Sequence, residues 1–196
     1  DELVERFSLD RVAKNPAVFD MDKLVWVNGQ HMKKLSIEEI TENAIPQLLE
    51  AGFIDENFLA DSAKRTWLEK VIDQEREHVS YAAQFPNEVR QYFLDDVQFE
   101  GEEEKELLKD SEVWPGIKMF LEKLPTTEMT EEGVKALFKG ITKESGLPGK
   151  KVFMPIRVAL TGEKHGPEMH HLIPMLGELR IQKRIQNTLD QLGITL

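Results

Sequence analysis

Apolar residues along most of the chain recur every three or four positions and do not alternate. This spacing is the period of an amphipathic helix and not that of a half-buried strand. The clearest start signal is Ser36-Ile-Glu-Glu39, a capping box that predicts a helix to about Glu50 with Gly52 as its stop. No convincing strand pattern is present, so the sequence predicts an all-α fold of consecutive small helical bundles.

The other helices are predicted from the same three- and four-residue spacing of apolar positions and from the residues that start or end helices. The run from Val152 to Leu160 fits a buried strand or a buried helix, and Pro155 favours the helix. The acidic stretch 100–110 is interpreted as a solvated helix or linker. The further predicted helices are 19–32 with an interruption at Asn28-Gly29, 61–78, 115–124, 130–140, 148–162 and 167–192. The helix that leads to His78 must break or kink around Pro86, and the last helix either continues or restarts after Gly177.

Composition narrows the class of protein. The chain has 196 residues, of which 40% are hydrophobic and 31% charged, and it has no cysteine. The absence of cysteine excludes a disulfide framework, a cysteine zinc site, an iron–sulfur cluster and thiol catalysis. No apolar run approaches the roughly 18 residues of a membrane helix, and the charged opening DELVERFS is no signal peptide. We therefore expect a soluble, globular, cytoplasmic protein without a membrane partner.

The charge is distributed unevenly. The net charge is -11, which by itself argues against a nucleic-acid binder. Residues 1–132 contain 15 basic and 31 acidic side chains, whereas residues 133–196 contain 10 basic and 5 acidic ones. A basic region on an acidic body is the asymmetry expected when one face meets a polyanion, although it also arises by chance.

Common catalytic motifs are missing. The sequence has no G-x-S-x-G, H-E-x-x-H, G-x-x-x-x-G-K-[ST] or G-x-G-x-x-G pattern. His165 lies five and six positions before His170 and His171, a spacing that favours solvated or RNA-facing imidazoles over a metal site. Arg157 interrupts the apolar run VFMPIRVAL, so it is paired with a carboxylate or faces a ligand.

Two groups of motifs resemble the bacterial glutamyl-tRNA synthetases. Phe7-Ser-Leu-Asp-Arg-Val12, Pro16-Ala-Val-Phe-Asp20 and Trp26 with Asn28-Gly29 are similar to that family's stem-contact segment. Met154-Pro-Ile-Arg-Val-Ala-Leu-Thr-Gly162 with His165-Gly-Pro-Glu168 is similar to its second anticodon-binding bundle. The resemblance implies an all-helical anticodon-binding cage, divided into a stem-contact end at 1–55 and helical subdomains at 56–125 and 126–196.

The resemblance further implies a part of a class I ligase that joins glutamate to tRNA with ATP and Mg²⁺. The family's HIGH-like and KMSKS-like ATP motifs do not occur in these residues, so we expect no catalytic residue, no metal ligand and no cofactor in this chain. The expected partner is a tRNA for glutamate, with a tRNA for glutamine left open, bound by a monomer and without DNA. The implied anticodon contacts are Arg157, His165, Gly166, Pro167, Met169, His170 and Arg76, and the implied tRNA-backbone contacts are Arg11, Lys14, Lys164, Lys183 and Arg184.

Two other classes of function stay open from the sequence alone. An acidic helical adaptor for protein helices predicts an exposed apolar groove and no salt-sensitive RNA binding. A hydrolase with paired carboxylates needs two acidic side chains in one cleft, and no spacing nominates them.

Overall fold

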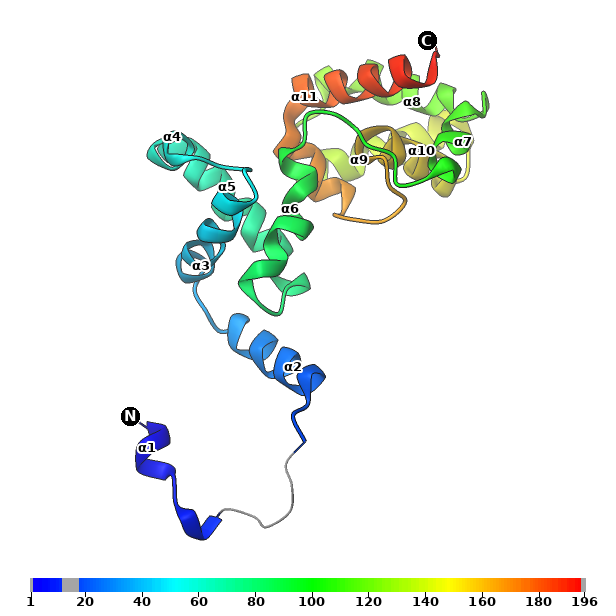
Figure 1. Ribbon diagram of the computed structural model, residues 1–196. Helices are drawn as coiled ribbons and strands as arrows, with labels where there is room; N and C mark the ends of the chain where they lie inside the picture. The colour runs from blue at the N-terminus through cyan, green and yellow to red at the C-terminus, as the bar shows by residue number, and fades with distance from the viewer. Residues whose placement is uncertain (1, 12–17, 195–196) are drawn as a thin grey trace.

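The protein is seen here in a computed structural model that describes residues 2–11 and 18–194 (Figure 1). The described residues form helices and no strand, as the hydrophobic period predicts. None of these helices is both long enough and apolar enough to span a bilayer. The elements are α1 (Glu2–Arg6), η1 (Leu9–Arg11), α2 (Met21–Met32), α3 (Ile37–Glu50), α4 (Glu56–Ala60), α5 (Ser62–Glu75), η2 (Arg76–His78), η3 (Ala82–Gln84), α6 (Phe85–Phe93), α7 (Glu102–Lys109), α8 (Trp114–Lys123), η4 (Leu124–Thr126), α9 (Glu131–Ser145), α10 (Gly149–Thr161) and α11 (Met169–Leu192).

Helix α1 and the start of α2 extend away from the packed helices, whereas the C-terminal end of α2 packs against them through Gly29 and Met32 (Figure 1). Asp20 caps α2 by accepting a 3.0 Å hydrogen bond from the Lys23 amide. The predicted interruption at Asn28-Gly29 is wrong, because α2 continues to Met32. Gly29 is buried where a Cβ would lie 3.0 Å from the Ser80 hydroxyl, so this glycine permits close packing and does not end the helix. The exposed apolar side chains of this region are Val4, Phe7, Leu9, Val18, Phe19, Met21, Leu24 and Trp26.

Helices α3 to α6 form one packed group. The predicted capping box is confirmed: the Glu39 amide donates to the Ser36 hydroxyl at 3.2 Å, and the Ser36 amide donates to the Glu39 carboxylate at 2.8 Å. Helix α3 packs on α5, which in turn packs on α6, around buried residues such as Leu48, Leu68 and Phe85. The predicted boundary between residues 55 and 56 therefore runs through a packed group.

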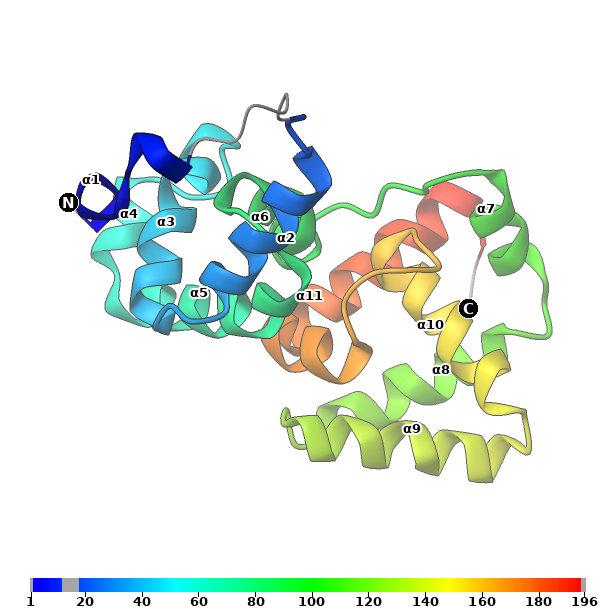
Figure 2. The same cartoon turned by 90° about the horizontal axis from the view of Figure 1, so that it is seen from below.

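Helices α7 to α11 form the second group (Figure 2). Thr130 caps α9 as predicted, but α9 passes its predicted end at Gly140 and reaches Ser145. Helix α10 ends at Gly162, as predicted, and α11 breaks at Gly177, where the sequence left open whether the helix continues or restarts. Helix α8 packs against α9 and α10, so the predicted boundary between residues 125 and 126 separates helices of one group.

Two arginines of α11 join the groups at the C-terminus of α6. Arg180 donates to the Tyr92 carbonyl at 2.8 Å, and Arg184 donates to the Gln91 carbonyl at 2.8 Å. The last carbonyls of a helix lack partners within the helix and carry the negative end of its dipole, so cationic donors stabilise this end. The junction fixes α11 and the loop before it relative to the first group.

Candidate functional site

The loop between α10 and α11 belongs to the second packed group and contacts the first, because Gln91 of α6 donates to the Glu163 carboxylate at 2.9 Å. Most of the binding residues predicted from the sequence lie in or beside this loop. Gly162 ends α10 with φ at +75°, and its carbonyl accepts a 3.0 Å hydrogen bond from the Glu100 amide. Inside the loop, the Thr161 hydroxyl donates to the Glu163 carbonyl at 3.2 Å and accepts from the Glu163 amide at 3.2 Å. These bonds hold the loop while His165 and Gly166 stay exposed.

Arg157 supports this loop from α10. Its Nη1 donates to the Pro167 carbonyl oxygen at 2.9 Å, and the side chain is partly exposed. No carboxylate among the described residues forms an ion pair with it; Glu168 contributes only a longer-range attraction. Burial lowers the pKa of Arg157, and Glu168 raises it in part. A guanidinium has five donors, so Arg157 can hold the loop with one N–H and offer others to a ligand.

Two of the predicted anticodon contacts are buried instead of exposed. Met169 is 1% exposed and packs in the core, so it offers no surface on which a base could stack. Pro167 is buried beside the Arg157 guanidinium, and only its carbonyl takes part in the polar contacts of the loop. The family motif predicts this loop as the contact segment, but it does not show which of the loop's side chains point inward.

Arg76 holds the backbone between α2 and α3. Its Nη2 donates to the Leu35 carbonyl at 2.8 Å and to the Lys33 carbonyl at 3.3 Å, and its side chain is 19% exposed. Both hydrogen bonds join η2 of the first packed group to the segment that links α2 with α3. Anticodon contact by Arg76 therefore stays a prediction, and the structure gives this side chain a local structural role.

The predicted backbone contacts differ in their accessibility. Lys164 pairs with Glu103 at 2.7 Å and Lys183 pairs with Asp95 at 3.6 Å, and both lysines keep exposed surface. The prediction for Arg184 is wrong: its side chain is 1% exposed and donates to backbone carbonyls, so it cannot reach a phosphate. Lys14 and the side chain of Arg11 lie outside the described residues.

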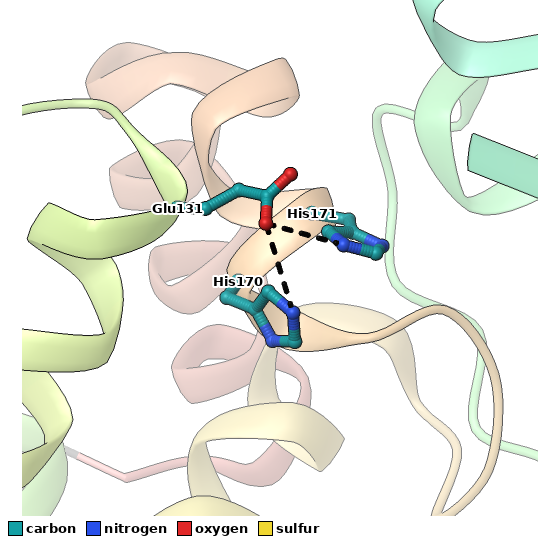
Figure 3. A group of neighbouring side chains, drawn as sticks. All are labelled: Glu131, His170 and His171. Carbon is teal, nitrogen blue, oxygen red and sulfur yellow. Dashed lines mark ion pairs between the residues drawn. The ribbon is translucent and has the colours of Figure 1, made fainter. Parts of the chain in front are cut away.

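His170 lies beside His171, with ring centroids 4.3 Å apart, at the start of α11. Glu131, at the start of α9, places its Oε2 atom 3.5 Å from His171 Nε2 and 4.0 Å from His170 Nε2 (Figure 3). The histidine spacing could not predict this group, because its third member comes from a different helix. The only hint of this group in the sequence was the pair of adjacent histidines near the predicted start of a helix.

A cavity of about 300 Å³ lies beside the loop, between the two packed groups. Acidic side chains and histidines surround it, so it is poorly suited to a phosphate. Glu75 in its wall is 4% exposed and accepts a 2.5 Å hydrogen bond from the Tyr92 hydroxyl. Burial raises the pKa of Glu75, a bond from Tyr92 and the charge of His78 lower it, and Glu88 raises it. The cavity is lined by Gln74, Glu75, His78, Glu88, Gly166, Pro167, Glu168 and His171.

Glu75→Gln is expected to change how stability depends on pH. A carboxyl whose pKa is raised in the folded state stabilises the fold below its unfolded pKa, and this contribution is lost as pH rises through the folded pKa. The variant should therefore match the parent near pH 4 and exceed it by on the order of 1 kcal/mol near pH 8. Urea denaturation of both chains at several pH values measures the difference, and a difference that shrinks as pH rises would contradict it.

The sequence also matches known proteins. The family model described as "Anticodon binding domain" matches residues 39–189. The chain is 44% identical to glutamate–tRNA ligase 1 of Caldicellulosiruptor saccharolyticus over 185 residues, which cover 94% of this chain and 38% of that protein. It is 36% identical to the glutamate–tRNA ligase of Bacillus subtilis over 188 residues, which cover 95% and 38%. The chain thus spans about 38% of the length of these relatives.

A solved structure shares the fold. The crystal structure of a glutamate tRNA ligase from Elizabethkingia meningosepticum, in complex with its amino acid, superposes with a TM-score of 0.80 at 23% identity. The superposition covers 97% of this chain and 36% of the other. The family model covers most of the chain, including the loop after α10 and both ends of the α6–α11 junction. The chain therefore belongs to the anticodon binding domain family and matches the C-terminal part of the glutamate–tRNA ligases.

Proposed function

We propose that this chain reads the anticodon of a tRNA for glutamate as part of a glutamate–tRNA ligase. The observation that carries the proposal is the match of residues 39–189 to the anticodon binding domain family. The curated relatives given above are glutamate–tRNA ligases, which supports glutamate as the amino acid of the cognate tRNA. In this proposal the protein works in the cytoplasm as a monomer, and acceptance of a tRNA for glutamine depends on how the anticodon is read.

The loop after α10 supplies the surface for the proposed contact. Proteins that read single-stranded RNA take up splayed bases, stack them on planar side chains and bind their edges through hydrogen bonds. Arg157 can donate to a base edge while it holds the loop through Pro167, and the exposed His165 adds a planar ring. Lys164 and Lys183 can exchange their carboxylate partners for phosphates, because both ion pairs are partly solvated.

The ligase activity itself belongs to the whole protein of which we propose these residues form a part. Ligation of glutamate to tRNA uses ATP and Mg²⁺, and we assign neither to a residue of this chain, because no ATP motif occurs in its sequence. Eight large apolar side chains among the described residues from Val4 to Trp26 are exposed, and they support a further packing partner for this region. We propose that another part of the ligase covers them.

Arg157→Ala is expected to weaken tRNA binding by about 5- to 150-fold, because a lost hydrogen-bonded contact to a base costs about 1–3 kcal/mol. Arg157→Lys should keep a donor for the Pro167 carbonyl but lose the planar fork, and should recover only part of the affinity. The affinities are measured by titrating a labelled tRNA for glutamate with each chain.

The matched control is Arg65→Ala, which removes an exposed arginine of α5 that pairs with Glu42 and Glu69. Its affinity should stay within about twofold of the parent, because exposed ion pairs contribute little. Equal losses in the Arg65 and Arg157 variants would show that only overall charge matters and would overturn the assignment of Arg157.

A further inference from the structure

The group Glu131, His170 and His171 has the composition and spacing of a metal site. One oxygen, Glu131 Oε2, faces the Nε2 atoms of both histidines, at 3.5 and 4.0 Å (Figure 3). These separations exceed a hydrogen bond of 2.7–3.2 Å. Two ligand atoms that each lie about 2.1 Å from one ion are roughly 3.4 Å apart at the tetrahedral angle. One ligand atom from each residue lies within 4.8 Å of the other two, so a small closure would bring all three around one ion.

We propose that Glu131, His170 and His171 bind a divalent transition-metal cation of the zinc type. Imidazole nitrogens together with a carboxylate oxygen suit Zn²⁺ and its neighbours, whereas Mg²⁺ and Ca²⁺ prefer oxygen ligands. Three protein ligands leave a fourth position of the tetrahedron for water. This site does not rest on the proposed function, since none of its geometry involves tRNA.

A second carboxylate and access from solvent support metal binding by the two histidine rings. Glu168 Oε2 lies 3.9 Å from His170 Nδ1, the ring nitrogen that does not face Glu131. A carboxylate near the second nitrogen is the usual outer partner of a metal-bound histidine, because it orients the ring and fixes its tautomer. The side chains of both histidines are about a quarter exposed, which leaves the ion a path from solvent.

The ion would connect two helices of the second packed group. Glu131 is the first residue of α9, and both histidines lie in the first turn of α11, immediately after the loop that carries His165 and Gly166. One competitor is present: Lys135 pairs with Glu131 Oε2 at 3.4 Å, and the ion must replace this contact. A bound metal would therefore stabilise the fold and restrain the end of the loop.

The test is calorimetric titration of the whole chain, freed of any histidine tag, with Zn²⁺ and in parallel with Mg²⁺. We expect one equivalent of Zn²⁺ to bind with saturation and Mg²⁺ not to bind. Glu131→Gln and His171→Asn should each weaken Zn²⁺ binding at least about tenfold, because each removes a direct ligand. His31→Gln is the matched control, since His31 is an exposed histidine of α2 outside the group. Its Zn²⁺ affinity should equal that of the parent.

A second measurement shows whether a variant that fails to bind Zn²⁺ is still folded. The melting temperature of the parent and of His31→Gln should rise with Zn²⁺ concentration, and that of Glu131→Gln should not. Lys135→Met should tighten Zn²⁺ binding severalfold, because it removes a competing cation. Absence of saturable binding at millimolar Zn²⁺, or equal binding by the parent and both ligand variants, would overturn the site.

Discussion

Replacing Arg184 with alanine should lower the free energy of unfolding by about 3–5 kcal/mol, the usual cost of breaking a buried charged network. Its guanidinium donates to the Leu160 carbonyl at 3.2 Å, to the Gln91 carbonyl at 2.8 Å and to the Leu94 carbonyl. These oxygens lie at the C-terminal ends of α10 and α6, where helix carbonyls lack backbone partners. Burial, followed by the nearby charge of Arg180, lowers the pKa of Arg184 to about 10, because both disfavour the charged guanidinium. Alanine would leave the buried Leu160 and Gln91 carbonyls and the partly buried Leu94 carbonyl without this donor.

Urea denaturation compares Arg184→Ala with its neighbour Lys183→Ala. Lys183 is exposed and pairs with Asp95 at 3.6 Å, so its loss should cost less than about 1 kcal/mol. If both variants lost the same small amount, the junction of α6, α10 and α11 would not depend on Arg184. The result also decides between the structural role seen here and the phosphate contact that the sequence predicted.

Gly162→Ala should cost about 2–4 kcal/mol of stability, the sum of a left-handed backbone penalty and a steric overlap. The residue has φ at +75°, a conformation that residues with a Cβ adopt at a cost. A Cβ at this position would also overlap the Gln98 carbonyl, which belongs to the extended segment before α7. The contact is made by backbone atoms on both sides. Neither the segment nor α10 can therefore move aside without breaking the hydrogen bond from the Glu100 amide to the Gly162 carbonyl.

Gly146→Ala separates the two contributions. Gly146 ends α9 with φ at +67°, but no atom lies within 4 Å of the Cβ that alanine would add. This control should lose only about 1–2 kcal/mol, the backbone part alone. Thermal or urea denaturation of both variants gives the comparison, and a loss at Gly162 no larger than that at Gly146 would contradict the close approach of the Gln98 backbone.

Helix ends were predictable where their signals are local. The Ser36–Glu39 capping box lies within four residues, and it forms as predicted. Gly29 and Gly140 misled the prediction, because the sequence does not show what lies beside them. Gly29 packs against Ser80 from a distant part of the chain. Gly140 precedes the fully buried Ile141, and burial of such a side chain compensates for the roughly 1 kcal/mol that a helical glycine costs.

For the site, the sequence could nominate a segment but could not show which of its side chains face solvent. The motif contains Arg157 and His165, and the structure places Arg157 on α10 beside the loop and the exposed His165 in the loop itself. Met169 and Arg184 carry the residue types of RNA contacts, yet they face the interior, because helix orientation and not composition decides which side is solvated. Glu131 joins two histidines from another helix, a contact that depends on tertiary packing alone.

Anticodon reading by this chain can be measured by titrating it with two tRNAs at two salt concentrations. One is a tRNA for glutamate, and the other is the same tRNA with its central anticodon base changed. We expect binding that weakens as salt rises, because phosphate contacts release counterions, and that weakens further with the changed base. Binding that responds to neither the base nor the salt would contradict anticodon recognition and would favour an acidic helical adaptor instead.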